Sequence, residues 1–186
     1  MNAFRLIRSA RFALLLLFPA ALFAKAEVLI DFKQISRDPD GTVFKCYQYT
    51  FGDWGSGKVI DLRGKGALVQ APSGKGGLGE NKTLVKFDKT PLVDLHFIIG
   101  NANQAKAISF SLTDKDGTEQ SWEIPIGELP RGTDQRVRLD LTKSSSEQKP
   151  GKTPGMDLKK ILTWQVRGDY ADPKVEVLLI ELIGQK

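Results

Sequence analysis

The chain has 186 residues, with 27 basic and 22 acidic side chains, one cysteine and one histidine. A single cysteine excludes an intramolecular disulfide, and a single histidine excludes a metal site built on two or more imidazoles. A chain of this length suffices for one domain with its own hydrophobic core.

The N-terminal segment has the layout of an export signal. Three arginines without an acid precede the apolar run 12–23, and the Ala-x-Ala sequence at 24–26 is typical of a cleavage site. The apolar run falls short of the roughly 20 residues that a membrane-spanning helix needs. We therefore expect a signal peptide over 1–26, a mature domain over 27–186, a periplasmic or extracellular location, and no membrane span after cleavage. An uncleaved anchor is the alternative.

Loss of the leader changes the charge of the protein. The 27 basic residues of the whole chain, less the three arginines and Lys25 of the leader, leave 23 against 22 acidic ones, a net charge of +1. Because the basic excess goes with the leader, nucleic acid is not an expected partner.

Alternation of apolar and polar residues dominates the mature region. It is clearest at 107–114, where Ile108, Phe110 and Leu112 alternate with hydroxyl side chains. The segment 175–183 is nearly all apolar, which favours a central strand covered on both faces. In chain order, strands are expected at 28–32, 66–71, 83–87, 92–99, 107–114, 118–126, 136–141, 161–167 and 175–183.

The segments between these strands are rich in turn-forming residues. Asp116-Gly117 lies between two predicted strands and indicates a hairpin with a type I′ turn. Only 156–160 suggests a helical turn. The pattern predicts an all-β fold, a two-sheet antiparallel β-sandwich, with Trp122 and Trp164 in its core.

A glycine-rich stretch and two acidic turns have the spacing of ligand sites. Residues 74–79 match G-x-G-x-x-G, but a strand rather than a helix is expected after them, which favours a glycine loop over a nucleotide site. The acidic turns, Asp-x-Asp-Gly at 38–41 and 114–117, suit Ca²⁺, yet neither continues into an EF-hand loop. The second is explained as the hairpin turn, so Asp38 and Asp40 are the metal candidates, with a plain turn as the alternative.

No complete catalytic centre is expected. His96 is the one histidine, and the sequence has no G-x-S-x-G motif whose serine it could activate. A glycosidase needs only two carboxylates, and Asp94, Glu123 and Asp140 lie on predicted polar strand faces, where solvated acids are also common. Cys46 is expected to be a small buried side chain rather than a reactive thiol.

The polar strand faces supply the candidate ligand-binding residues. Hydroxyl-rich ligands such as sugars suit forked donors, amides and carboxylates, and aromatic side chains can stack on the apolar face of a pyranose. The candidates are Asp94, His96, Gln165 and Arg167 for hydrogen bonds, and Tyr47, Tyr49 and Trp54 for stacking.

Three segments resemble a known family: 92–117, with its strand, Gly-Asn-Ala-Asn loop, strand and Asp-Gly turn; Pro-Gly-Met-Asp-Leu-Lys-Lys-Ile at 154–161; and Gln-Val-Arg-Gly-Asp at 165–169. They are similar to bacterial galactose-binding-like jelly rolls, among them carbohydrate-binding modules related to family 11 and the domain of complex I intermediate-associated proteins. The resemblance implies a jelly roll, often with a structural Ca²⁺ and a ligand groove on the concave sheet. Two departures stand out, since the polar strands carry no row of Trp or Tyr and no catalytic domain is attached.

The expected function is that of a non-catalytic carbohydrate-binding module of an exported bacterial protein, with a polysaccharide or oligosaccharide as partner. The alternative is a structural or protein-interaction domain that meets an envelope protein at the same face. A glycan hydrolase is the third reading.

Overall fold

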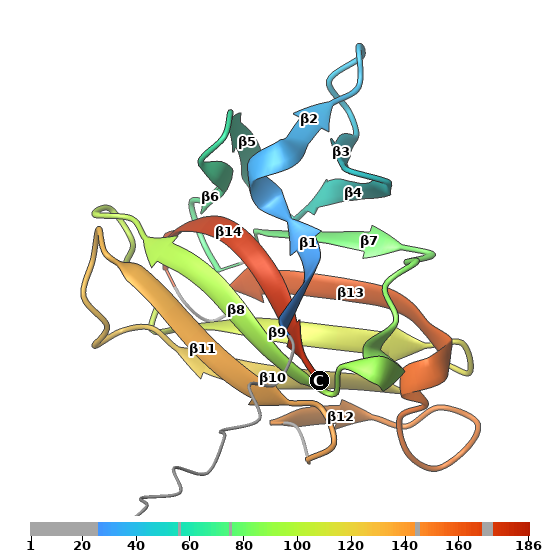
Figure 1. The fold of residues 1–186 in the computed structure, drawn as a ribbon. Helices are drawn as coiled ribbons and strands as arrows, with labels where there is room; N and C mark the ends of the chain where they lie inside the picture. Colours follow the sequence, from blue (N-terminus) through green and yellow to red (C-terminus); the bar gives the residue numbers. More distant parts are fainter. Residues whose placement is uncertain (1–25, 56, 75, 144–145, 169–172) are drawn as a thin grey trace, which may run out of the picture.

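A computed structural model describes residues 26–55, 57–74, 76–143, 146–168 and 173–186. Two antiparallel sheets pack face to face, and the predicted all-β sandwich is confirmed (Figure 1). The predicted leader lies outside the described residues, apart from Ala26.

Six strands form the first sheet and eight form the second. The six-stranded sheet has the order β11 (Asp134–Asp140), β8 (Leu92–Ile99), β14 (Val175–Gln185), β6 (Gly66–Ala71) and β5 (Lys58–Leu62), and β1 (Ala26–Asp31) also pairs with β14. The eight-stranded sheet has the order β12 (Glu147–Lys149), β10 (Glu119–Pro125), β9 (Ala107–Asp114), β13 (Ile161–Gly168), β7 (Gly77–Asn81), β4 (Tyr49–Trp54), β3 (Phe44–Cys46) and β2 (Ile35–Arg37). Three short 3-10 turns complete the described elements: η1 (Phe32–Gln34), η2 (Phe87–Lys89) and η3 (Leu158–Lys160).

The core lies between the sheets and follows the alternation of the sequence. On β8, Val93, Leu95, Phe97 and Ile99 are fully buried. Burial of each such side chain contributes about 1.5–3 kcal/mol relative to leaving it exposed. Because every second residue is committed to the core, the residues between them lie on the outer face of each sheet.

An aromatic cluster centred on Trp164 joins the two sheets. Trp164 is fully buried and contacts Phe32 and Phe51 edge-on, at centroid distances of 6.0 and 5.4 Å. Its indole Nε1 donates to the carboxylate of Glu80, itself buried on β7, at 3.0 Å. Trp122 is also buried, so both tryptophans lie in the core as predicted.

Strand β14 is central, as expected, but its outer face is only partly covered. It pairs with β8 along one side, and with β6 and then β1 along the other. The register shifts between Leu179 and Glu181, which marks a β-bulge. The bulge inserts one residue, so Glu181 lies on the outer face instead of the inner face that strict alternation from Leu179 would give it.

The strand predicted at 83–87 is wrong, and the segment leads into η2 instead. The strand of this region is β7, which includes residues of the predicted glycine loop. A Cβ at Gly77 would come within 2.9 Å of the carbonyl oxygen of Val166 on β13. Close packing of two backbones selects glycine at position 77, a reason that residue preference for strands does not reveal.

The hairpin between β9 and β10 forms at the predicted place with a different turn. Gly117 has φ +97°, whereas Asp116 is not among the described residues with positive φ, which excludes type I′. Gly117 N–H donates to the carbonyl of Asp114, and Asp114 N–H donates to that of Thr118. This is a three-residue loop, in which a type I turn is followed by one left-handed residue. The helical turn suggested at 156–160 appears as η3.

Candidate functional site

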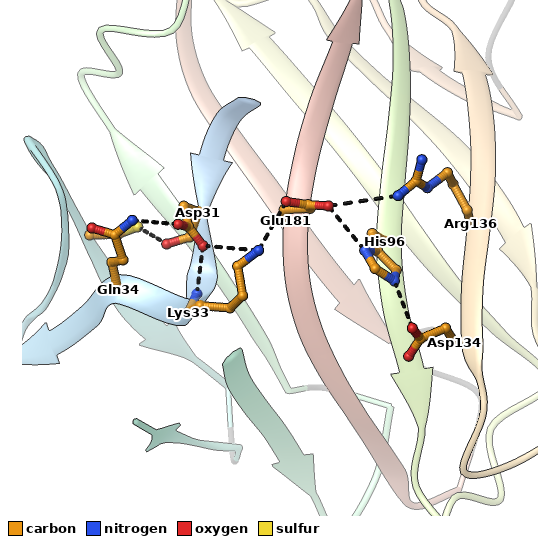
Figure 2. A network of polar contacts seen from close by, with 8 residues as sticks. Asp31, Lys33, Gln34, His96, Asp134, Arg136 and Glu181 are labelled. Carbon is orange, nitrogen blue, oxygen red and sulfur yellow. Dashed lines mark hydrogen bonds and ion pairs between the residues drawn. The ribbon is translucent and has the colours of Figure 1, made fainter. Parts of the chain in front are cut away.

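A row of charged side chains crosses the outer face of the six-stranded sheet. Sheet pairing aligns Arg136 on β11 with His96 on β8, His96 with Glu181 on β14, and Glu181 with Asp31 on β1. His96 Nδ1 lies 3.2 Å from Glu181 Oε1, and Lys33 Nζ donates to Glu181 Oε2 at 3.1 Å (Figure 2). Glu181 is therefore the central group of the row.

The first 3-10 turn fixes the β1 end of this row. Asp31 caps η1 by accepting a hydrogen bond from Lys33 N–H at 3.1 Å, and it also accepts one from Gln34 Nε2. Lys33 Nζ lies between Asp31 Oδ1, at 3.7 Å, and Glu181. A side-chain cap of this kind holds the turn and its lysine in one orientation.

Burial and pairing act in opposite directions on the carboxyl group of Glu181. Burial raises the pKa of Glu181, but hydrogen bonds with His96 and Lys33 outweigh it and hold that pKa below its usual value. The hydrogen bond to Glu181 raises the pKa of Lys33 in turn. Both groups are consequently charged at neutral pH.

A depression of about 380 Å³ opens beside this row, and we call it the tyrosine depression. Tyr47 is 77% exposed at its lip, while Tyr49 is half-buried and packs against the core. Its lining residues are Glu27, Val28, Leu29, Asp31, Lys33, Gln34, Tyr47, Gln48, Tyr49 and Glu181. Aromatic faces beside fixed carboxylates and amides are the groups that hold a polyhydroxyl ring.

Asp94 lies on the same outer face, but its carboxylate is already hydrogen-bonded to other side chains of the protein. Its carboxylate accepts two hydrogen bonds from Arg138, at 2.8 and 2.9 Å, and one from Gln185 at 3.0 Å. The Arg138 hydrogen bonds lower the pKa of Asp94. Asp94 therefore ties β8 to β11 and β14.

The structure does not bring all the predicted binding residues together. Gln165 and Arg167 pair with Ser111 and Ser109 on the outer face of the eight-stranded sheet, on the opposite side of the sandwich from His96. Alternation shows that a side chain points away from the core but not which sheet carries it. Trp54 lies in β4, and its side chain is outside what the structure describes.

Nor do the three candidate carboxylates of a glycosidase converge. Asp94 and Asp140 lie on β8 and β11, whereas Glu123 lies on β10 of the other sheet. Asp140 is engaged by Thr142 and Lys143.

Cys46 is buried as predicted, and burial raises the pKa of its thiol to about 12. A thiol with so high a pKa is a poor nucleophile at neutral pH.

The predicted metal residues lie in the loop between β2 and β3. The carboxylate of Asp38 accepts hydrogen bonds from the backbone N–H groups of Thr42 and Val43, at 3.0 and 3.3 Å. Among the described residues, no three His, Cys, Asp or Glu side chains gather as a metal site. This is the hydrogen bonding of a turn and does not supply the six to eight oxygens that Ca²⁺ takes, so calcium at Asp38 and Asp40 stays a prediction.

The sequence pattern did not single out several residues of the row and of the turn beside it: Asp31, Lys33, Gln34, Arg136 and Glu181. Glu181 did leave one signal, because it is one of two acids in an otherwise nearly apolar strand. Asp31 caps η1, and Lys33 and Gln34 lie within it; the sequence pattern does not predict this turn.

No protein-family model and no curated protein matches the sequence. Several solved structures share the fold. A family 11 carbohydrate-binding module of the cellulase Lic26A-Cel5E from Clostridium thermocellum aligns over 87% of this chain and 94% of its own, with TM-score 0.57 and 13% identity. A family 11 module from the same organism, in complex with a β-1,3-1,4-mixed-linked tetrasaccharide, aligns over 81% and 94%, with TM-score 0.54 and 13% identity.

An agarase also matches over 87% of this chain, with TM-score 0.60 and 13% identity, but over only 24% of its own length.

Within the described ranges we find no helix with the length and apolar character of a membrane span. The fold of this chain is a jelly-roll sandwich of the kind seen in carbohydrate-binding modules.

Proposed function

We propose that the protein is a non-catalytic carbohydrate-binding module, and that its sugar binds in the tyrosine depression. The observation that carries the proposal is a polar depression with an exposed tyrosine at its lip, beside a row of fixed charges, on a jelly roll similar to carbohydrate-binding modules. Export, predicted from the leader, would place the module where polysaccharides occur.

The chemistry of the lining suits a pyranose. Tyr47 and Tyr49 offer aromatic faces to the C–H groups of the ring. The carboxylates of Asp31 and Glu181 retain acceptor capacity beyond the bonds they make, because each ionised carboxylate has about four lone-pair sites. Lys33 holds both in place, so little side-chain freedom is lost when a sugar binds.

Calorimetric titration against a panel of polysaccharides tests the proposal. Tyr47→Ala is expected to weaken binding about tenfold, the effect of losing roughly 1.4 kcal/mol of contact. Gln165→Ala, on the outer face of the other sheet, is the matched control and should bind as the wild type does. Loss of polysaccharide binding in the Gln165 variant alone would place the site on the eight-stranded sheet. If the wild type binds no polysaccharide, the proposal is wrong.

The calcium ion that the family resemblance implies has a separate test. If Asp38 and Asp40 hold an ion, chelation should lower the melting temperature, and Asp38→Asn should remove that response. An unchanged melting temperature on chelation would exclude a structural ion.

A further inference from the structure

A second depression, of about 180 Å³, is also lined by residues of β1. It shares Glu27, Val28, Leu29 and Tyr49 with the tyrosine depression, so the two lie next to each other. We call the second one the lysine depression. The residues that line it but not the other are Leu84, Val85, Lys86, Lys89 and Lys186.

The two depressions differ in charge. The tyrosine depression has three acids, Glu27, Asp31 and Glu181, against one base, Lys33. The lysine depression has three lysines against one acid. An extended ligand that spans both depressions would therefore meet hydrogen-bond acceptors in one and cations in the other.

Two of the three lysines are available to a ligand. Lys186 forms an ion pair with Glu27 at 2.6 Å. Within the part of the chain that the structure describes, no ion pair or side-chain hydrogen bond involves the ammonium group of Lys86 or Lys89. Asp88 lies between them in the sequence but does not line the depression. The lysine depression thus has two uncompensated positive charges.

The backbone that carries these lysines is held firmly by the core. Val85 and Phe87, on either side of Lys86, are buried, and so is Thr90 after η2. Thr90 packs so closely on β14 that a Cβ at Gly184 would come within 2.6 Å of it. Anchored backbone on both sides fixes where the two lysine side chains begin, and their flexible stems let the ammonium groups adjust to a ligand.

Exposed apolar surface adjoins the charges. Leu84 is 58% exposed and Val28 is 53% exposed, and both line the lysine depression beside Tyr49. A sugar ring needs apolar contact for its C–H face, whereas a free inorganic anion does not. The combination favours a saccharide that carries an acidic group.

We infer that the module recognises an acidic polysaccharide, with Lys86 and Lys89 binding the carboxylate or sulfate of one residue while a neighbouring residue lies in the tyrosine depression. The inference rests on the proposed function and specifies its ligand class. Ammonium groups bind carboxylate and sulfate oxygens through charge-assisted hydrogen bonds, which are stronger than neutral ones.

The test compares polymers that differ only in charge. Polygalacturonate is titrated beside its methyl-esterified form, and a sulfated galactan beside its desulfated form. For at least one pair, the wild type should bind the acidic polymer about tenfold more tightly than its neutral partner. Added salt should narrow that difference, because it screens exposed charges.

Matched variants locate the effect. Lys86→Gln with Lys89→Gln should lower affinity for the acidic polymer about tenfold and leave the neutral partner unaffected. Lys58→Gln with Lys65→Gln removes the same charge from exposed positions outside both depressions and should change neither. Equal melting temperatures for the two double variants would show that both fold.

Each remaining outcome decides the matter. Equal binding of acidic and neutral polymers, or equal losses in the two double variants, overturns the acidic ligand and leaves the carbohydrate-binding proposal standing. Binding to anionic phospholipid vesicles but to no acidic polymer overturns it in favour of a membrane surface. No binding to any polysaccharide removes the proposed function as well.

Discussion

At the scale of single residues, Tyr47 has a backbone conformation that tyrosine rarely adopts. Its φ is +59°, in the hairpin turn between β3 and β4, where the left-handed region favours glycine or asparagine. The strained turn holds an exposed aromatic ring at the lip of the tyrosine depression. Strain of this kind is typical of sites where position matters more than stability.

Replacing this tyrosine should separate stability from binding. Tyr47→Asn is expected to stabilise the fold by about 1 kcal/mol, because asparagine tolerates the left-handed conformation. Polysaccharide affinity should fall at the same time. Urea unfolding and calorimetry of the variant measure the two effects. A clear loss of stability would show that the ring supports the fold instead.

Asp94 should contribute a pH-dependent part of the stability. Its pKa is lowered in the folded state, chiefly by Arg138, whereas the pKa of an aspartate in the unfolded chain is about 3.9. Its contribution is therefore present above about pH 4 and is lost as the pH falls through the lower folded pKa. Thermal unfolding from pH 6 downward should show a steeper acid loss for the wild type than for Asp94→Asn. Identical acid profiles would contradict the prediction.

At the scale of elements, the end of β9 organises the loop that precedes η3. Asp114 is buried, and its carboxylate accepts hydrogen bonds from the backbone N–H groups of Asp116, Thr118 and Asp157. The acidic turn at 114–117 thus acts as a local clamp between the β9–β10 hairpin and the start of η3.

Removing the clamp should be costly. Asp114→Ala leaves three backbone donors without their partner, and we expect a loss of about 2 kcal/mol in the free energy of unfolding. Glu123→Ala, at an exposed position on the adjacent strand, should change it by less than about 0.5 kcal/mol. Urea denaturation of both variants checks this, and equal effects would refute the clamp.

For the molecule as a whole, the predicted cleavage site after Ala26 falls within β1. Ala26 is the first residue of β1 and pairs with Gln185. Cleavage after Ala26 would remove one residue of β1 and keep Glu27, which lines both depressions.

If the protein is exported and cleaved as proposed, its mature form should begin at Glu27. Intact-mass measurement of material from the periplasm or medium, with N-terminal sequencing, checks the site of cleavage. A retained leader would favour the uncleaved anchor.

Much of the sandwich was predictable because apolar residues recur at every second position of a core strand. Segments 66–71, 92–99 and 107–114 are strands with the bounds expected from alternation. The short strands β2 to β5 and β12 were not predicted, since most are too brief to show a period. Strand β7 is glycine-rich and depends on its neighbours.

The candidate site was predictable only in part. Tyr47, Tyr49 and His96 were singled out by residue type, and they lie in or beside the tyrosine depression. The remaining polar candidates divide between two outer faces. Their separation depends on strand order, a long-range property that no local pattern contains.

The alternate burial of side chains, the all-β sandwich and the core position of both tryptophans could be predicted from the amino-acid sequence. Those properties follow from local periodicity and from the free energy of burying apolar surface. Which polar residues meet depends instead on the long-range pairing of the strands. The bulge that turns Glu181 outward and the pairing of β1 with β14 bring together Asp31, Glu181 and His96, which are far apart along the chain.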